Sequence, residues 1–110
     1  MFSIKISSKA QKDLLEIKEY ISEELCNTTA ANNVLSIVIK RIRELAKFPL
    51  MGAPLSSIID FETGYRFLVC GQYTIFYRHE DDTVYVDRVL FGRRDFMSIL
   101  FGDVAQEERN

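Results

Sequence analysis

The chain has 110 residues, of which 47% are hydrophobic and 27% are charged, and its formal net charge is −2. This length and composition predict one compact domain with a hydrophobic core. The balanced charge disfavours binding of RNA or DNA over a wide surface, because proteins that bind in this way usually carry an excess of basic residues.

Cysteine usage and hydropathy favour a cytoplasmic protein without a metal site. Cys26 and Cys70 lie far apart and the chain has a single histidine, His79, so metal-ligand spacing is absent. We expect both thiols to be free. No apolar run approaches the length that spans a bilayer, and the first residues read as a strand rather than a targeting segment, so we expect no contact with a membrane.

Residues 2–48 predict a strand and two helices. Residues 2–6 alternate between apolar and polar, which is typical of a half-buried strand. Ser8, with Gln11 three residues later, predicts a capping box, and Asn27 begins the turn that caps the second helix. Each helix carries one apolar stripe, so we expect an antiparallel helical hairpin. The stripes are Ala10, Leu14, Ile17, Ile21 and Leu25, followed by Ala31, Val34, Val38, Ile42 and Leu45.

Basic residues gather near the end of the second predicted helix, at Lys40, Arg41, Arg43 and Lys47. Cations interact favourably with the C-terminal end of a helix dipole, and we prefer this explanation to an RNA-binding patch. The residues that follow, 49–55, predict a rigid loop that contains both prolines of the chain.

Three strands within residues 65–91 predict an antiparallel meander, since apolar runs are separated by a turn at Gly71 and by an acidic turn at residues 80–82. A short helix with apolar Phe96, Ile99 and Leu100 should follow and end at Gly102. We expect a single α+β domain over residues 1–102 and a polar, mobile tail over residues 103–110.

Strand periodicity predicts one sheet face on the core and another face that carries arginines. On the third strand it groups Val84, Val86, Arg88 and Leu90 against Tyr85, Asp87, Val89 and Phe91. We expect the core to bring together Leu14, Ile21, Val38, Ile42, Phe67 and Ile75.

The arginines are the strongest candidates for a binding site: Arg66, Arg78, Arg88, Arg93 and Arg94. Arginine clamps phosphate or carboxylate groups but is a poor general base, so this set suits binding of an anionic group. A plainer alternative is that these arginines are surface charges paired with Asp87 and Asp95. Groups able to transfer protons are few, namely His79 and the tyrosines Tyr65, Tyr73 and Tyr77.

Four short motifs follow one another in a fixed order along the chain. They are Phe48-Pro49 with Gly52 and Pro54-Leu55, Tyr65-Arg66 with Leu68-Val69, Tyr73 with Ile75-Phe76-Tyr77-Arg78, and Arg88-Val89-Leu90 with Gly92-Arg93-Arg94-Asp95. From Phe2 to about Gly102 the chain thereby resembles the RelE/ParE superfamily, the toxin components of bacterial type II toxin–antitoxin modules. The resemblance implies a helical hairpin packed on an antiparallel sheet, with a short C-terminal helix.

The resemblance implies one of two mechanisms. RelE-like members cut mRNA in the ribosomal A site, whereas ParE-like members inhibit DNA gyrase and lack the basic residues of the nuclease set. Matched by position, Arg66 and Arg94 retain basic residues of that set, while its other positions fall on Leu68, Thr74 and Leu100. We therefore expect gyrase inhibition without chemistry of its own. A ribosome-dependent endoribonuclease that uses Arg66 and Arg94, and a non-toxic antitoxin-binding domain, stay open as alternatives.

The resemblance also implies the partners of the protein. A cognate antitoxin should bind through a segment that folds on binding, with its carboxylates against Arg78, Arg93 or Arg94. DNA gyrase is the expected target, and the ribosome with its mRNA is the alternative. Growth inhibition and plasmid stabilisation in a bacterium are the implied roles, with no cofactor. The stoichiometry of the complex stays open.

Overall fold

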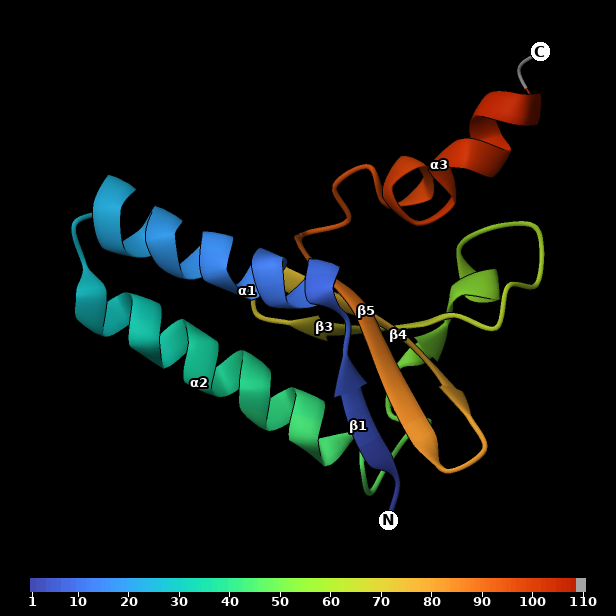
Figure 1. Cartoon of the computed structure of the whole chain (residues 1–110), viewed down its shortest axis with the longest axis horizontal. Coiled ribbons are helices and arrows are strands. Elements are labelled where there is room, and N and C mark those ends of the chain that lie inside the picture. The colour runs from blue at the N-terminus through green and yellow to red at the C-terminus, as the bar shows by residue number, and fades with distance from the viewer. Residues whose placement is uncertain (109–110) are drawn as a thin grey trace.

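The computed structural model describes residues 1–108, and the side chains of residues 1–102 (Figure 1). In chain order the elements are β1 (Ser3–Ile6), α1 (Ser8–Glu19), the π-helical turn η1 (Tyr20–Glu24), α2 (Thr28–Glu44), β2 (Ala53–Pro54), the 3-10 turn η2 (Leu55–Ser57), β3 (Arg66–Cys70), β4 (Tyr73–Glu80), β5 (Thr83–Phe91) and α3 (Phe96–Glu108). The predicted α+β fold with a helical hairpin is confirmed. None of the helices described is long and apolar enough to cross a membrane.

One sheet contains all five strands, in the order β1-β5-β4-β3-β2. The meander of β3, β4 and β5 is antiparallel as expected, and β2 pairs antiparallel with β3 at two positions. The first strand differs, because β1 runs parallel to β5, with Ser3 opposite Thr83 and Ile6 opposite Val86. The crossover between these parallel strands is long enough because it includes the whole hairpin and strands β2 to β4.

The helix boundaries follow from local capping. Ser7, not Ser8, is the N-cap of α1, since the Ser7 hydroxyl accepts a hydrogen bond from the Ala10 backbone N–H at 3.0 Å. Asn27 caps α2 as predicted, with its side chain accepting from the Ala30 N–H at 2.9 Å. The two helices therefore lie antiparallel and side by side, joined by a short turn at the end of η1 (Figure 1).

The sheet is buried on both faces, which corrects the expectation of one apolar face and one arginine face. The hairpin packs on one face, against residues that include Ile75, Val84 and Val86. On the other face a second core joins Phe67 and Phe76 to Leu55, Leu90 and the first turns of α3. Ile21, Val38 and Ile42 lie in the first core as predicted, with Leu14 packed against it, but Phe67 belongs to the second core.

A β-bulge in β5 explains why the predicted side-chain alternation is wrong in this strand. Phe76 pairs with Arg88 and Tyr77 pairs with Val86, so Asp87 is the extra residue. Beyond the bulge the alternation is reversed, and Val89 lies in the same core as Val84 and Val86. Leu90 lies in the second core, whereas the Arg88 guanidinium binds Asp13 on α1.

The C-terminal helix begins at Phe96, close to its predicted start, and its first helical stretch ends at Phe101, next to the predicted stop at Gly102. The helical backbone is interrupted at Phe101, with φ −129° and ψ 21°, and continues to Glu108. The mobility that we expect for residues 103–110 stays a prediction, and residues 109–110 lie outside the described part of the chain.

Candidate functional site

A groove of about 1020 Å³ opens between the hairpin and the end of the sheet. We call it the hairpin groove, and its lining includes Ile17, Tyr20, Leu25, Ile37, Phe91 and Arg94. Of these, Tyr20, Leu25, Ile37 and Phe91 are large apolar or aromatic side chains that are more than half exposed. Water-exposed apolar side chains gathered in one concave surface are typical of a protein-binding site.

One end of the hairpin groove is polar. Arg88 donates two hydrogen bonds to the buried carboxylate of Asp13, from Nε to Oδ2 and from Nη2 to Oδ1, both at 2.8 Å. The hydrogen bonds from Arg88 to Asp13 raise the pKa of Arg88, since they favour the charged guanidinium. The exposed Arg94 also lines the groove. The Arg88 guanidinium is therefore bound within the fold, whereas Arg94 is exposed.

The floor of the hairpin groove contains two groups that burial makes less acidic. Burial raises the pKa of the Cys70 thiol, so the nucleophilic thiolate is disfavoured there. Burial also raises the pKa of Tyr73. Cys70 and Cys26 are both free, as predicted. These groups suit packing against an apolar ligand rather than covalent chemistry.

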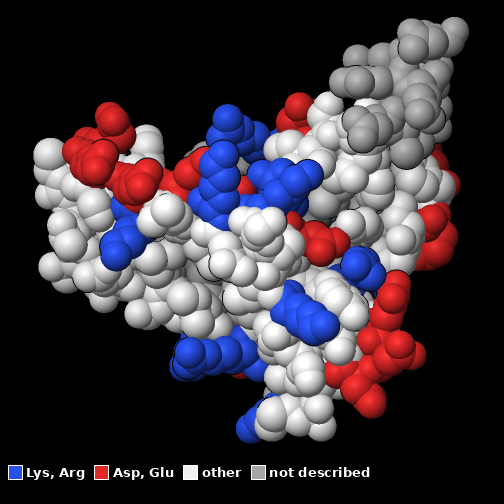
Figure 2. All heavy atoms as spheres, in the orientation of Figure 1, with Lys and Arg blue, Asp and Glu red and all other residues white. Residues whose placement is uncertain are grey.

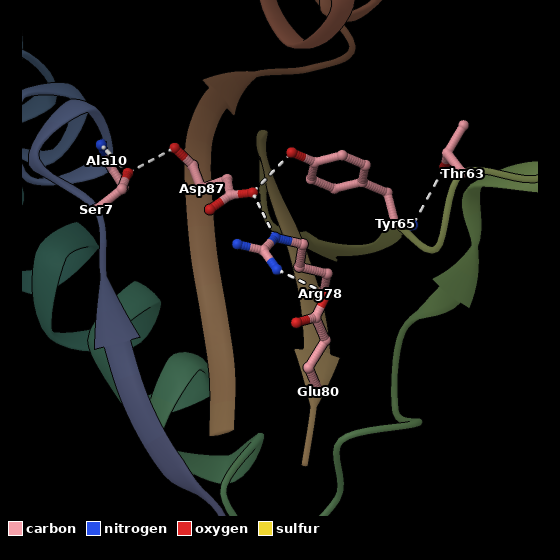
Figure 3. Close-up of polar contacts among 7 residues, drawn as sticks. All are labelled: Ser7, Ala10, Thr63, Tyr65, Arg78, Glu80 and Asp87. Carbon is pink, nitrogen blue, oxygen red and sulfur yellow. Dashed lines mark hydrogen bonds and ion pairs between the residues drawn. The ribbon is translucent and has the colours of Figure 1, made fainter. Parts of the chain in front are cut away.

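A second polar cluster surrounds the bulge residue Asp87 on the face of the sheet that bears α3 (Figure 3). The Tyr65 hydroxyl donates to Asp87 Oδ2 at 2.7 Å, and Arg78 Nε lies 3.4 Å from the same oxygen. The Arg78 guanidinium also pairs with Glu80 and lies 4.4 Å from the centre of the Tyr85 ring. Two carboxylates thus neutralise one arginine, so this cluster is a poor binding site for an anion.

Burial and the nearby Asp87 both affect the pKa values of Tyr65 and Arg78 in this cluster. Burial, together with the hydrogen bond to Asp87, raises the pKa of Tyr65 to about 12. Burial disfavours the charged form of Arg78, but the charges of Asp87 and Glu80 outweigh this and raise the pKa of Arg78. The ion pair of Arg78 with Asp87 agrees with the plainer interpretation of the arginines as paired charges.

The remaining arginines also differ in role. Arg66 donates to the backbone oxygens of Gly52, at 2.6 Å from Nη2, and of Leu50, at 3.3 Å. Arg93 is exposed, with its guanidinium carbon 5.4 Å from the centre of the Phe67 ring. Among the side chains that are described, neither Arg93 nor Arg94 forms an ion pair. The five arginines therefore do not form one cluster.

Surface charge is distributed unevenly over the face in Figure 2. Lys and Arg side chains gather near the start of α1 and the end of β5, close to the turn that leads into α3. Asp and Glu side chains lie over the tip of the hairpin and around the turn between β4 and β5. The end of β5 also contributes to the lining of the hairpin groove, through Leu90 and Phe91.

Each of the groups that could transfer a proton makes structural contacts. Tyr77 is fully buried, and its hydroxyl donates to the Pro49 carbonyl at 2.7 Å and accepts from the Gly52 N–H at 2.9 Å. The His79 ring packs edge-on against Phe2. Within residues 1–102 no group of acidic, histidine and cysteine side chains has a geometry that could hold a metal ion.

Asp13 is the site residue that the sequence interpretation missed. A signal was present, because Asp13 stands three residues after Ala10 and four before Ile17. An acidic residue within an apolar stripe is buried with the stripe and needs a cationic partner there. Its partner, Arg88, lies 75 residues away in sequence and could not be identified from the pattern alone.

Comparison with known proteins identifies relatives of this fold. A family model described as the ParE toxin of the type II toxin–antitoxin system parDE matches residues 4–96. A search of curated proteins gave no significant match.

Two solved structures share the fold of this chain at low sequence identity. A chain from the chromosomal ParDE toxin–antitoxin system of P. aeruginosa has a TM-score of 0.71 at 20% identity, over 84% of this chain and 97% of its own. A chain of the toxin–antitoxin complex RelBE2 from Mycobacterium tuberculosis has a TM-score of 0.61 at 21% identity, over 82% and 96%. At these identities the similarity shows a shared fold.

Proposed function

Since the chain belongs to the ParE toxin family of type II toxin–antitoxin systems, we propose that a cognate antitoxin holds it inactive and that the free protein inhibits DNA gyrase. We propose a bacterial cytoplasm as its location, because both proposed partners would act there. The proposal that an antitoxin binds this protein rests on the exposed apolar lining of the hairpin groove.

The hairpin groove suits an amphipathic helix. Tyr20, Leu25 and Ile37 stand along the hairpin and Phe91 stands on the sheet opposite. A helix bound between them would bury its apolar side chains against both the hairpin and the sheet. Binding of an amphipathic helix in a groove is a common mode of peptide recognition. Arg94 in the lining would meet a carboxylate of the bound segment, as a charged residue at the rim of an apolar interface does. The bound segment would order on binding.

The proposal of gyrase inhibition is supported by the family of the chain and by the contacts of Arg66 and Tyr65. Nuclease chemistry needs an electrostatic clamp on the phosphate and a group that moves protons. Arg66 is engaged with the carbonyls of Gly52 and Leu50, and the pKa of Tyr65 is raised to about 12, which makes Tyr65 a poor base at neutral pH. Inhibition by binding needs neither group.

The test is induction of the protein in a bacterial host, with labelled thymidine and labelled methionine supplied together. We expect DNA synthesis to stop before protein synthesis, and co-expression of the antitoxin gene to restore both. The account is wrong if protein synthesis stops first and mRNA is cut at codon boundaries. In that case Arg66→Ala and Arg94→Ala would distinguish the nuclease alternative, since both should abolish the cuts.

A further inference from the structure

The loop that follows α2 exposes two large apolar side chains. Phe48 is 60% exposed and Leu50 is 63% exposed, on either side of Pro49. We call Lys47, Phe48 and Leu50 the loop surface. Neither apolar side chain belongs to the two cores, and none of the three residues lines the hairpin groove. Burial in the fold therefore does not account for these side chains.

The backbone beneath the loop surface is held by hydrogen bonds to two side chains, the buried Tyr77 and the partly buried Arg66. The Tyr77 hydroxyl bridges the Pro49 carbonyl and the Gly52 N–H, and the Arg66 guanidinium binds the carbonyls of Leu50 and Gly52. These bonds hold the backbone on either side of Leu50 in one conformation. A loop whose backbone is already ordered loses less conformational entropy on binding, which favours tight contact with a partner.

The charge around the loop surface is positive. Lys40, Arg43 and Lys47 are exposed and recur at steps of three and four residues, so they form one stripe that leads to the loop. The acidic side chain of α2, Glu44, is already paired with Arg41 at 2.9 Å. The helix dipole accounts for some of this charge, but it does not account for exposed Phe48 and Leu50 beside it. Apolar anchors with a basic border fit an acidic protein surface.

We propose that the loop surface is where this protein contacts its target, and that the target offers an apolar recess bordered by carboxylates. This inference rests on the proposed function in taking the target to be a protein, namely gyrase. A few buried apolar or aromatic anchors usually dominate such contacts, while surrounding charges mainly set association rate and specificity. The antitoxin would bind a different surface, the hairpin groove.

The test compares two double variants that remove the same residue types. Phe48→Ala with Leu50→Ala removes the loop surface. Leu15→Ala with Phe61→Ala is the matched control, because Leu15 and Phe61 are 54% and 50% exposed and do not line the hairpin groove. Thermal unfolding first establishes that both variants fold. Growth arrest on induction, the concentration that halves gyrase supercoiling, and binding to the purified antitoxin are then measured.

We expect the loop variant to need at least about tenfold more protein for growth arrest and for gyrase inhibition, as loss of two anchors implies. Its antitoxin affinity and the potency of the control should match the wild type. A third variant, Lys40→Ala with Lys47→Ala, should weaken the dependence of inhibition on salt.

Equal potency of the loop variant and the wild type would overturn the proposal. A wild-type dimer that the loop variant dissociates would also overturn it, because the loop surface would then bind a second copy of this chain. If the wild type arrests growth but leaves purified gyrase active, the proposed function fails instead. Growth arrest then still tests the inference. The inference is supported if the loop variant loses growth arrest while the control variant keeps it. It is refuted if the loop variant still arrests growth.

Discussion

The carboxylate of Asp13 on α1 binds the guanidinium of Arg88 on β5 through two hydrogen bonds of 2.8 Å. The same carboxylate accepts the backbone N–H of Val89 at 2.9 Å. Since β1 ends at Ile6, opposite Val86, the next part of β5 has no neighbouring strand on that side. Asp13 therefore supplies the hydrogen-bond acceptor for the Val89 N–H at the open edge of the sheet, and it connects the hairpin to the sheet.

Replacing Asp13 with Ala should destabilise the protein by about 3–5 kcal/mol, the usual cost of leaving a buried charge without its partner. The loss should be large because both Arg88 and the Val89 N–H lose their acceptor. Arg41→Ala is the control, because it removes a surface pair with Glu44 that is worth about 1 kcal/mol or less. Urea unfolding measures both. Similar losses in the two variants would show that the Asp13 pair is not structural.

Gly52→Ala should destabilise the protein by about 1–3 kcal/mol, the usual cost of overpacking. A Cβ at this position would lie 2.5 Å from the Phe67 carbonyl oxygen and 2.8 Å from the Tyr77 hydroxyl. The control is Gly102→Ala, because a Cβ there meets nothing within 4 Å. Thermal unfolding of both variants checks this, and an unchanged midpoint for Gly52→Ala would mean that the loop moves freely.

Alkaline titration should reveal Tyr65 as a tyrosine with a pKa of about 12, above its ordinary value of 10.0. Because the pKa is raised in the folded state, the stability contributed by the neutral phenol is fully present below about pH 10 and is lost as the pH rises through 12. The difference in phenolate absorbance between the wild type and Tyr65→Phe measures this group alone.

The titration also separates the causes of the shift. In Asp87→Asn the pKa of Tyr65 should fall but stay above its ordinary value, because burial is the larger cause and the charge of Asp87 the smaller. A midpoint near 10 for the wild-type group would contradict both the burial of Tyr65 and its hydrogen bond to Asp87.

Ile37→Asp should abolish antitoxin binding while the free protein still arrests growth. Ile37 is exposed in the hairpin groove, so a carboxylate there leaves the fold intact but places an unpaired charge in the apolar contact. Calorimetric titration with the antitoxin measures the loss. The control is Leu15→Asp, since Leu15 is equally exposed outside the groove, and this variant should bind normally.

Much of the fold could be predicted because it depends on local patterns. The two apolar stripes determine which faces of α1 and α2 are buried, and Asn27 caps α2 as its side chain predicts. The three strands of the meander follow from apolar runs between turns. Each of these features depends on residues close together in sequence.

The features that could not be predicted depend on distant partners. The bulge at Asp87 is stabilised by Ser7, whose hydroxyl donates to the Asp87 carbonyl, and by Tyr65 and Arg78, which bind the Asp87 carboxylate. Phe67 joins a second core because α3 returns to that face of the sheet. Similarly, the arginines look equivalent in sequence, and only their partners distinguish Arg66 and Arg88 from Arg94. Gyrase inhibition and the site residues stay predictions.

The most direct test of the central claim is a supercoiling assay in which purified gyrase and relaxed plasmid are incubated with increasing amounts of this protein. We expect supercoiling to be lost or cleaved DNA to accumulate, and an equimolar amount of antitoxin to prevent either effect. A parallel reaction with translating ribosomes should show intact mRNA. Full gyrase activity at an excess of the protein, together with mRNA cut in the ribosomal A site, would contradict the account.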